Sequence, residues 1–134
     1  MTLSEHYSPI LIDHFERPRN AGAMPDANAE GYVVNPVCGD SMRLFLRIEA
    51  GLVARASFLT SGCPASIATS SAATELLAGL SIGEAEALPR ERFAEAVGGL
   101  PASKVHCSVL ATQAIRLAID VWRARDPASS TDPG

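Results

Sequence analysis

Aromatic residues, an excess of basic residues and long apolar runs are all missing or scarce in this sequence. Aromatic side chains make up 5% of the 134 residues, so a core would consist mainly of aliphatic side chains. The formal net charge of −4 leaves no surplus cations to displace counterions from nucleic acid, so we expect no nucleic-acid partner. No run approaches the roughly 18 apolar residues of a membrane span, and the N-terminus lacks the basic start of a signal peptide. We therefore expect no membrane association.

Charged residues are also sparse, at 19% against 47% hydrophobic residues, which excludes intrinsic disorder as the main state. The length suits one compact domain, and we predict a single domain over residues 1–125. Residues 126–134 contain two prolines and two serines and are predicted to form a disordered tail.

The three cysteines are an odd number and stand far apart, as Cys38, Cys63 and Cys107. A secreted disulfide framework normally uses an even number of cysteines. We therefore expect reduced thiols and a cytoplasmic protein.

The spacing of apolar residues predicts an α+β protein in which a small antiparallel sheet of about three strands carries helices on one face. Alternating apolar residues predict strands, at 40–48, 52–60 and, more weakly, Tyr32–Val34. Apolar residues at helical spacing predict helices, at 7–16, 64–78, 90–97 and 107–125. Residues 49–51 form a predicted hairpin turn, residues 18–31 a loop, and the capping box of Ser81 and Glu84 starts a further short helix.

Two buried faces follow from these patterns. In the second strong strand, Ala54, Ala56 and Phe58 are expected on one face. The apolar stripe of the last helix is expected to contain Leu110, Ala114, Leu117, Val121, Ile115, Ile119 and Trp122.

Each cysteine lies at a predicted boundary between elements, whereas a packing thiol more often sits in the middle of one. Cys38 precedes a strand, Cys63 stands between a strand and a helix, and Cys107 begins the last helix. The positive end of a helix dipole stabilises an anion, so we expect lowered thiol pKa values at Cys63 and Cys107, with Lys104 as a nearby cation.

Two further metal-binding side chains adjoin the cysteines. Asp40 follows Cys38 by two residues, so in an extended segment both side chains project to one side, and His106 directly precedes Cys107. Three thiolates and an imidazole form a common zinc site, and these donors also suffice for a two-iron cluster. Because soft metals hold a carboxylate or an imidazole less firmly than a thiolate, we infer a site that releases what it binds.

Several short motifs carry a resemblance to a known family. They are Tyr7-Ser8, Asp13-His14, Pro18-Arg19-Asn20-Ala21-Gly22, Cys38-Gly39-Asp40, Gly62-Cys63, Ser66-Ile67-Ala68, Ser70-Ser71, Lys104-Val105-His106-Cys107-Ser108 and Leu110-Ala111. In this order and at these separations, the chain resembles the iron–sulfur cluster assembly scaffolds of the IscU type, also found as the N-terminal domain of NifU. The resemblance implies the two-layer fold shared by SufE and NifU.

The resemblance also implies roles for the site residues. Cys38, Cys63 and Cys107 would be the cluster thiolates, Asp40 and His106 the exchangeable extra ligands, and Cys107 the persulfide acceptor. A scaffold of this family is not an enzyme. It accepts sulfur from a cysteine desulfurase, takes iron and electrons, builds a transient [2Fe–2S] cluster and transfers it to apo iron–sulfur proteins. Such scaffolds also bind zinc when isolated.

The chain departs from the family at one motif. The stretch that chaperones recognise in the family reads Leu-Pro-Pro-Val-Lys, whereas the corresponding stretch here is Leu100-Pro101-Ala102-Ser103-Lys104. The second proline and the valine are missing, which puts docking of Hsp70 and J-type chaperones in doubt. The presence of His106 beside the last cysteine favours the IscU and NifU branch over SufU-type relatives.

Two other functions compete with the scaffold. One is a small zinc-binding protein with a structural Cys3His site. The other is a thiol enzyme using Cys107, for which the adjacent His106 is poorly placed because consecutive helical side chains diverge by about 100°. Packing is the expected role of Tyr7, His14 and Phe15, His6 is expected to be a surface or packing residue, and Arg43 and Arg47 are expected on a solvated strand face.

Overall fold

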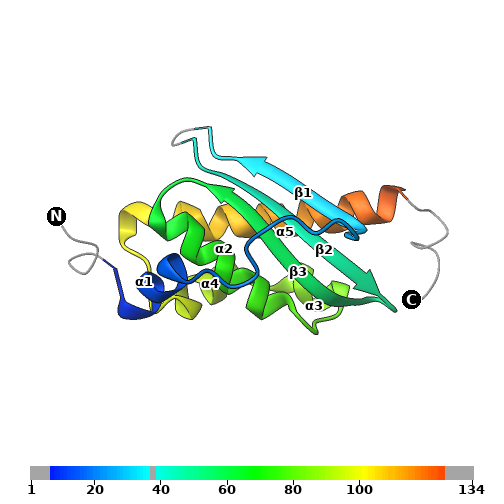
Figure 1. Ribbon diagram of the computed structural model, residues 1–134, viewed down its shortest axis with the longest axis horizontal. Helices are drawn as coiled ribbons and strands as arrows, with labels where there is room; N and C mark the ends of the chain where they lie inside the picture. The colour runs from blue at the N-terminus through cyan, green and yellow to red at the C-terminus, as the bar shows by residue number, and fades with distance from the viewer. Residues whose placement is uncertain (1–6, 37–38, 126–134) are drawn as a thin grey trace.

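The computed structural model describes residues 7–36 and 39–125, and it confirms the predicted α+β architecture (Figure 1). One antiparallel sheet has the strand order β1-β2-β3. Its strands are β1 (Ala29–Val34), β2 (Ser41–Glu49) and β3 (Leu52–Ser61). The helices are α1 (Pro9–Glu16), α2 (Pro64–Leu77), α3 (Ile82–Ala87), α4 (Arg90–Ala96), the short 3-10 helix η2 (Ala102–Lys104) and α5 (His106–Arg125). The predicted tail at 126–134 lies outside the described residues.

The main core lies between the sheet and the helices α2 and α5. The alternating side chains of β2 face this core, and all four are buried: Met42, Leu44, Leu46 and Ile48. On the opposite face of β2, Arg43 pairs with Glu30 and stacks over the Tyr32 ring, as expected for a solvated face. None of the described helices is long and apolar enough to cross a membrane.

The β2–β3 hairpin contains an irregularity that the alternation did not predict. Ala50 and Gly51 both have positive φ angles, 53° and 76°, as the two central residues of a tight hairpin turn require. Just beyond it, Ile48 pairs with Val53 while Arg47 pairs with Arg55, so Ala54 is an unpaired extra residue. The expectation that Ala54 shares a face with Ala56 and Phe58 is wrong, because this bulge shifts the alternation: Val53, Ala56 and Phe58 are buried and Ala54 is exposed.

The buried face of α5 also differs from the expected stripe. Leu117 and Val121 are each 37% exposed, whereas Ala114 and Ala118 are fully buried. A Cβ added to Gly31 of β1 would stand 2.4 Å from the carbonyl oxygen of Ala114 and 2.8 Å from the amide nitrogen of Ala118. The stripe is rotated toward small residues because α5 packs directly against the backbone of β1. Residues 29–31 pair with Leu44–Leu46 of β2 and form a strand, where the sequence predicted a loop.

A second, smaller cluster of buried side chains joins α1 and α4 to the starts of α2 and α5. Its buried members are Leu11, Ala65, Ala68, Ala72, Val97 and Cys107, and Tyr7 and Phe15 pack against it. His14 is buried beside it and bonds to the Ser71 hydroxyl at 2.8 Å through Nδ1. The predicted packing roles of Tyr7, His14 and Phe15 are therefore confirmed, while His6 lies outside the described residues.

Candidate metal centre

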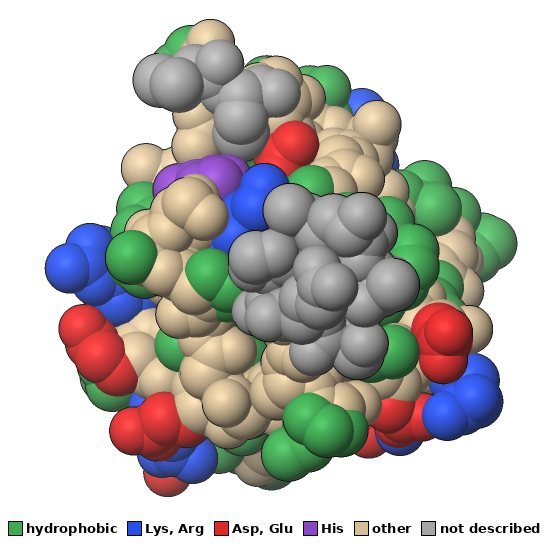
Figure 2. Space-filling view, turned by 90° about the vertical axis from the view of Figure 1, so that its left-hand side faces the viewer, with side chains coloured by type: hydrophobic (Ala, Val, Ile, Leu, Met, Phe, Trp, Pro, Cys, Tyr) green, Lys and Arg blue, Asp and Glu red, His purple; other side chains and the backbone are tan. Residues whose placement is uncertain are grey.

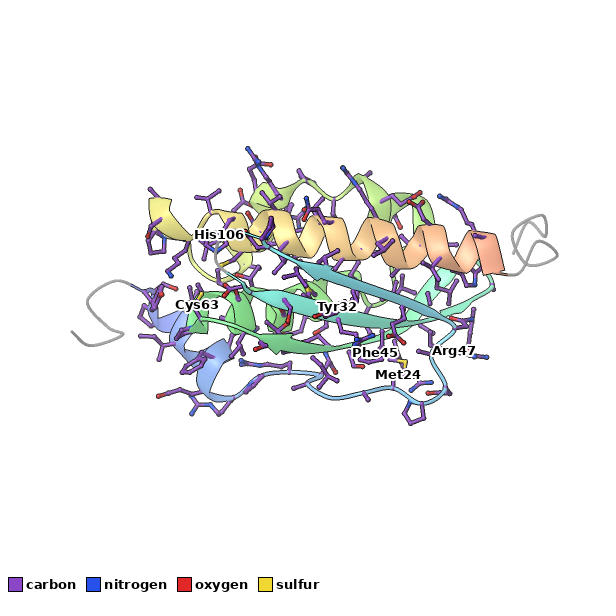
Figure 3. All side chains as sticks on the ribbon, turned by 90° about the horizontal axis from the view of Figure 1, so that it is seen from above. Met24, Tyr32, Phe45, Arg47, Cys63 and His106 are labelled. Carbon is purple, nitrogen blue, oxygen red and sulfur yellow. The ribbon has the colours of Figure 1, made fainter. Side chains whose placement is uncertain are left out.

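Four of the five predicted ligand residues meet at one end of the molecule. Asp40 precedes β2, Cys63 lies between β3 and α2, and His106 and Cys107 begin α5. Figure 3 shows the labelled Cys63 and His106 at this end of the sheet. Figure 2 faces the same end and shows histidine, acidic and basic side chains adjoining one another. The fifth residue, Cys38, lies outside the described residues.

Cys63 occupies the N-cap position of α2, as predicted, with Pro64 in the first turn of the helix. Its side chain makes no hydrogen bond to the helix backbone. The thiol instead points toward the carboxyl group of Asp40, and Sγ lies 3.5 Å from Oδ2. The loop between β3 and α2 therefore places a sulfur beside an oxygen that comes from a different strand.

His106 and Cys107 approach each other more closely than their helical positions suggest. The distance between His106 Nε2 and Cys107 Sγ is 3.7 Å, so the expectation of diverging side chains is wrong. Side chains in a helix lean toward its N-terminus, and at the first turn no earlier turn blocks them. The imidazole reaches back over the helix start and also lies 3.7 Å from Asp40 Oδ2.

These contacts gather three kinds of donor atom. One ligand atom each from Asp40, His106 and Cys107 lie within 4.8 Å of one another, and Cys63 adjoins the group through Asp40. An oxygen, a nitrogen and two sulfurs therefore face a common space. This combination suits zinc or iron rather than calcium or magnesium, which take oxygen ligands.

The surroundings shift the pKa values of Cys107 and Asp40 in opposite directions. Burial raises the pKa of the Cys107 thiol to about 12, and the hydrogen bond with Ser66 offsets only part of this rise. The expected lowering of the pKa at Cys107 is therefore wrong, because the residue is 2% exposed and desolvation outweighs the effect of the helix end. Burial also acts to raise the pKa of Asp40, but hydrogen bonds from Ser66 and Cys63 and the nearby His106 hold it below its usual value.

Lys104 lies close enough to act on the site electrostatically. The negative charge of a Cys63 thiolate raises the pKa of Lys104, with smaller contributions from Tyr7 and Cys107. The predicted position of this cation near the cysteines is confirmed.

One site residue received no role in the sequence analysis. The hydroxyl group of Ser66 donates a hydrogen bond of 2.5 Å to Asp40 Oδ2 and lies 3.2 Å from Cys107 Sγ. The sequence did contain a signal for Ser66, which is its position three residues after Cys63. A residue three positions after a helix N-cap faces back toward that cap.

The fold and the donor set define a class of small α+β proteins with a mixed thiol, carboxylate and imidazole centre at one end of an antiparallel sheet. The family model described as the NifU-like N-terminal domain matches residues 6–129, so the chain belongs to this family.

Two relatives and one solved structure agree with this assignment. The chain is 49% identical to the iron–sulfur cluster assembly scaffold protein IscU 1 of Archaeoglobus fulgidus, over 84% of this chain and 74% of the relative. It is 45% identical to the IscU scaffold protein of Azotobacter vinelandii, over 84% of this chain and 91% of the relative. The crystal structure of a NifU-like N-terminal protein from Brucella abortus has a TM-score of 0.73 and covers 92% of this chain and 99% of its own, at 15% identity, and so supports the fold.

Proposed function

We propose that this protein is a scaffold on which a [2Fe–2S] cluster is assembled and from which it is transferred to apo iron–sulfur proteins. The single observation that carries the proposal is the convergence of Asp40, Cys63, His106 and Cys107 at one end of the fold. Two relatives that are 45–49% identical to this chain over the aligned residues bear the name of such scaffolds.

The cluster is the cargo, and the proposed ligands are Cys38, Cys63 and Cys107 together with Asp40 or His106. A two-iron cluster takes two protein ligands on each iron. Asp40 and His106 compete for the fourth position, because both lie near Cys107 and 3.7 Å from each other. An oxygen or nitrogen ligand binds iron less firmly than a fourth thiolate, which favours release of the finished cluster. The same donors also suit zinc.

Cys107 is the proposed persulfide acceptor, and the proposed sulfur donor is a cysteine desulfurase. The Cys107 thiolate would attack the outer sulfur of a persulfide on the desulfurase, and the desulfurase cysteine would leave as its thiolate. The Cys107 thiol must lose its proton first, and burial opposes this loss. The nearby His106 nitrogen, 3.7 Å from the sulfur, is the group placed to take the proton. We propose a carrier in the cytoplasm rather than an enzyme.

Reconstitution tests the scaffold directly. The protein is mixed with a cysteine desulfurase, cysteine, ferrous iron and a reductant, and the absorption spectrum of a [2Fe–2S] cluster is followed over time. We expect the spectrum to develop on the parent protein and to be largely lost on Cys63→Ala. Failure of the spectrum to develop on the parent, with no difference between parent and variant, would count decisively against the scaffold.

The Asp40, His106 and Cys107 group also supports a second candidate, a structural zinc site. The two functions differ in what chelation does to the fold. A structural zinc contributes folding energy, so its removal unfolds the protein. The scaffold predicts that the protein keeps its helix and sheet content after chelation, because two clusters of buried apolar side chains hold the elements together. Circular dichroism before and after chelation separates the two.

A further inference from the structure

Ser66 contacts three of the four described side chains that the proposed function uses. Its hydroxyl oxygen lies 2.5 Å from Asp40 Oδ2, 3.2 Å from Cys107 Sγ and 3.6 Å from Cys63 Sγ. One hydroxyl group therefore connects the start of β2, the β3–α2 loop and the start of α5. Ser66 itself is 2% exposed, so bulk water does not compete for these contacts.

The backbone of Ser66 is tied to its surroundings. Ser66 lies in the first turn of α2, and its carbonyl oxygen accepts a hydrogen bond of 2.8 Å from the Ser70 hydroxyl. Ser70 in turn bonds to Thr60 of β3 at 2.7 Å. The backbone that carries the Ser66 hydroxyl group is therefore connected to both α2 and the sheet.

A hydroxyl group has one hydrogen to donate and two lone pairs to accept with. The hydrogen of Ser66 goes to the Asp40 carboxylate, and its oxygen lies within hydrogen-bond distance of Cys107 Sγ. One hydroxyl group thus fixes the positions of two ligand side chains that come from the start of β2 and the start of α5.

We infer that Ser66 is a positioning residue that holds the Asp40 carboxyl group and the Cys107 sulfur in place to bind a metal. The inference rests on the metal centre of the proposed function and assigns it a supporting residue. Outer-shell hydrogen bonds of this kind typically change metal affinity by about 10–100-fold.

The test is a titration of the metal-free protein with Co(II), whose absorption bands report thiolate and geometry. We expect Ser66→Ala to bind Co(II) at least about tenfold more weakly than the parent, with an unchanged thermal midpoint. Ser66→Thr keeps the hydroxyl and should restore the affinity to within about threefold. Ser71→Ala is the matched control, because Ser71 is equally buried in α2 but its hydroxyl group bonds to His14 and to the Arg19 amide, not to the ligands or to Ser66.

Equal affinity of Ser66→Ala and the parent for Co(II) would overturn the inference, and so would an equal loss of affinity in Ser71→Ala. If Ser66→Ala is thermally unstable, the comparison uses Ser66→Thr, which keeps the hydroxyl group. Weak Co(II) binding by a stable Ser66→Thr also overturns the inference. Reconstitution of the cluster on the parent is scored separately. If Ser66→Ala binds Co(II) more weakly but no cluster forms on the parent, the scaffold function is rejected and the role of Ser66 stands. If a cluster forms on the parent but Ser66→Ala binds Co(II) as tightly as the parent, the role of Ser66 is rejected and the scaffold function stands.

Discussion

The carboxyl group of Asp40 occupies the space that a side chain at position 62 would need. A Cβ built on Gly62 would stand 2.6 Å from Asp40 Cγ and 2.7 Å from Oδ1. Gly62 also directly precedes Cys63, so the absence of a side chain there lets a carboxylate from another strand reach the thiol.

This contact predicts that Gly62→Ala displaces Asp40 from the metal centre. The added methyl group must push the carboxylate away, since real Cβ atoms do not approach other atoms so closely. We expect Co(II) affinity to fall by about tenfold or more. Gly83→Ala is the control, because a Cβ there meets only Ser81 Oγ, at 4.0 Å. Unchanged affinity in Gly62→Ala would show that Asp40 does not bind the metal from this position.

Gly31→Ala is expected to lower the free energy of unfolding. Its Cβ would stand 2.4 Å from the carbonyl oxygen of Ala114, and a backbone atom in the middle of α5 cannot move aside as a flexible side chain can. Forcing extra volume into a packed interface typically costs about 1–3 kcal/mol. Urea denaturation measures the loss, and an equally stable Gly31→Ala would mean that β1 and α5 pack less closely than described.

His14 is expected to make the protein less stable as the pH falls. Burial, together with the charge of Arg19, lowers the pKa of His14 below its usual value, although Glu75 and Asp13 oppose this. The unfolded chain then binds the proton more readily, so stability is lost as pH falls through about 6.5, the ordinary pKa of histidine. Denaturation of the parent and His14→Gln across this range checks the sign: the stability of the variant should depend less on pH.

The capping box of α3 gives a prediction about stability alone. The Ser81 hydroxyl accepts from the Glu84 amide at 3.1 Å, and the Glu84 carboxylate accepts from the Ser81 amide at 2.9 Å. Ser81→Ala leaves a helix N-terminus without its cap and should cost about 1 kcal/mol. Because α3 lies away from the metal centre, Co(II) affinity should stay at the parent value, and a loss of affinity would contradict this local role.

The sequence predicted a helix start or a turn correctly where a few neighbouring residues determine it. The capping box of Ser81, the turn at Ala50 and Gly51, and the helix start after Cys63 all follow from residues within a few positions of each other. Ala54, Leu117 and Val121 were placed wrongly because their burial depends on a bulge in β3 and on the rotation of α5 against β1. Neither feature leaves a mark in the spacing of apolar residues.

The sequence by itself determined the α+β class, the helix and strand boundaries to within a few residues, and the identity of the donor side chains, because these depend on residue type and short-range periodicity. Only the tertiary structure decided that Asp40, Cys63, His106 and Cys107 meet and that Ser66 joins them. It also decided that Cys107 resists deprotonation, because desolvation depends on which distant segments cover a thiol.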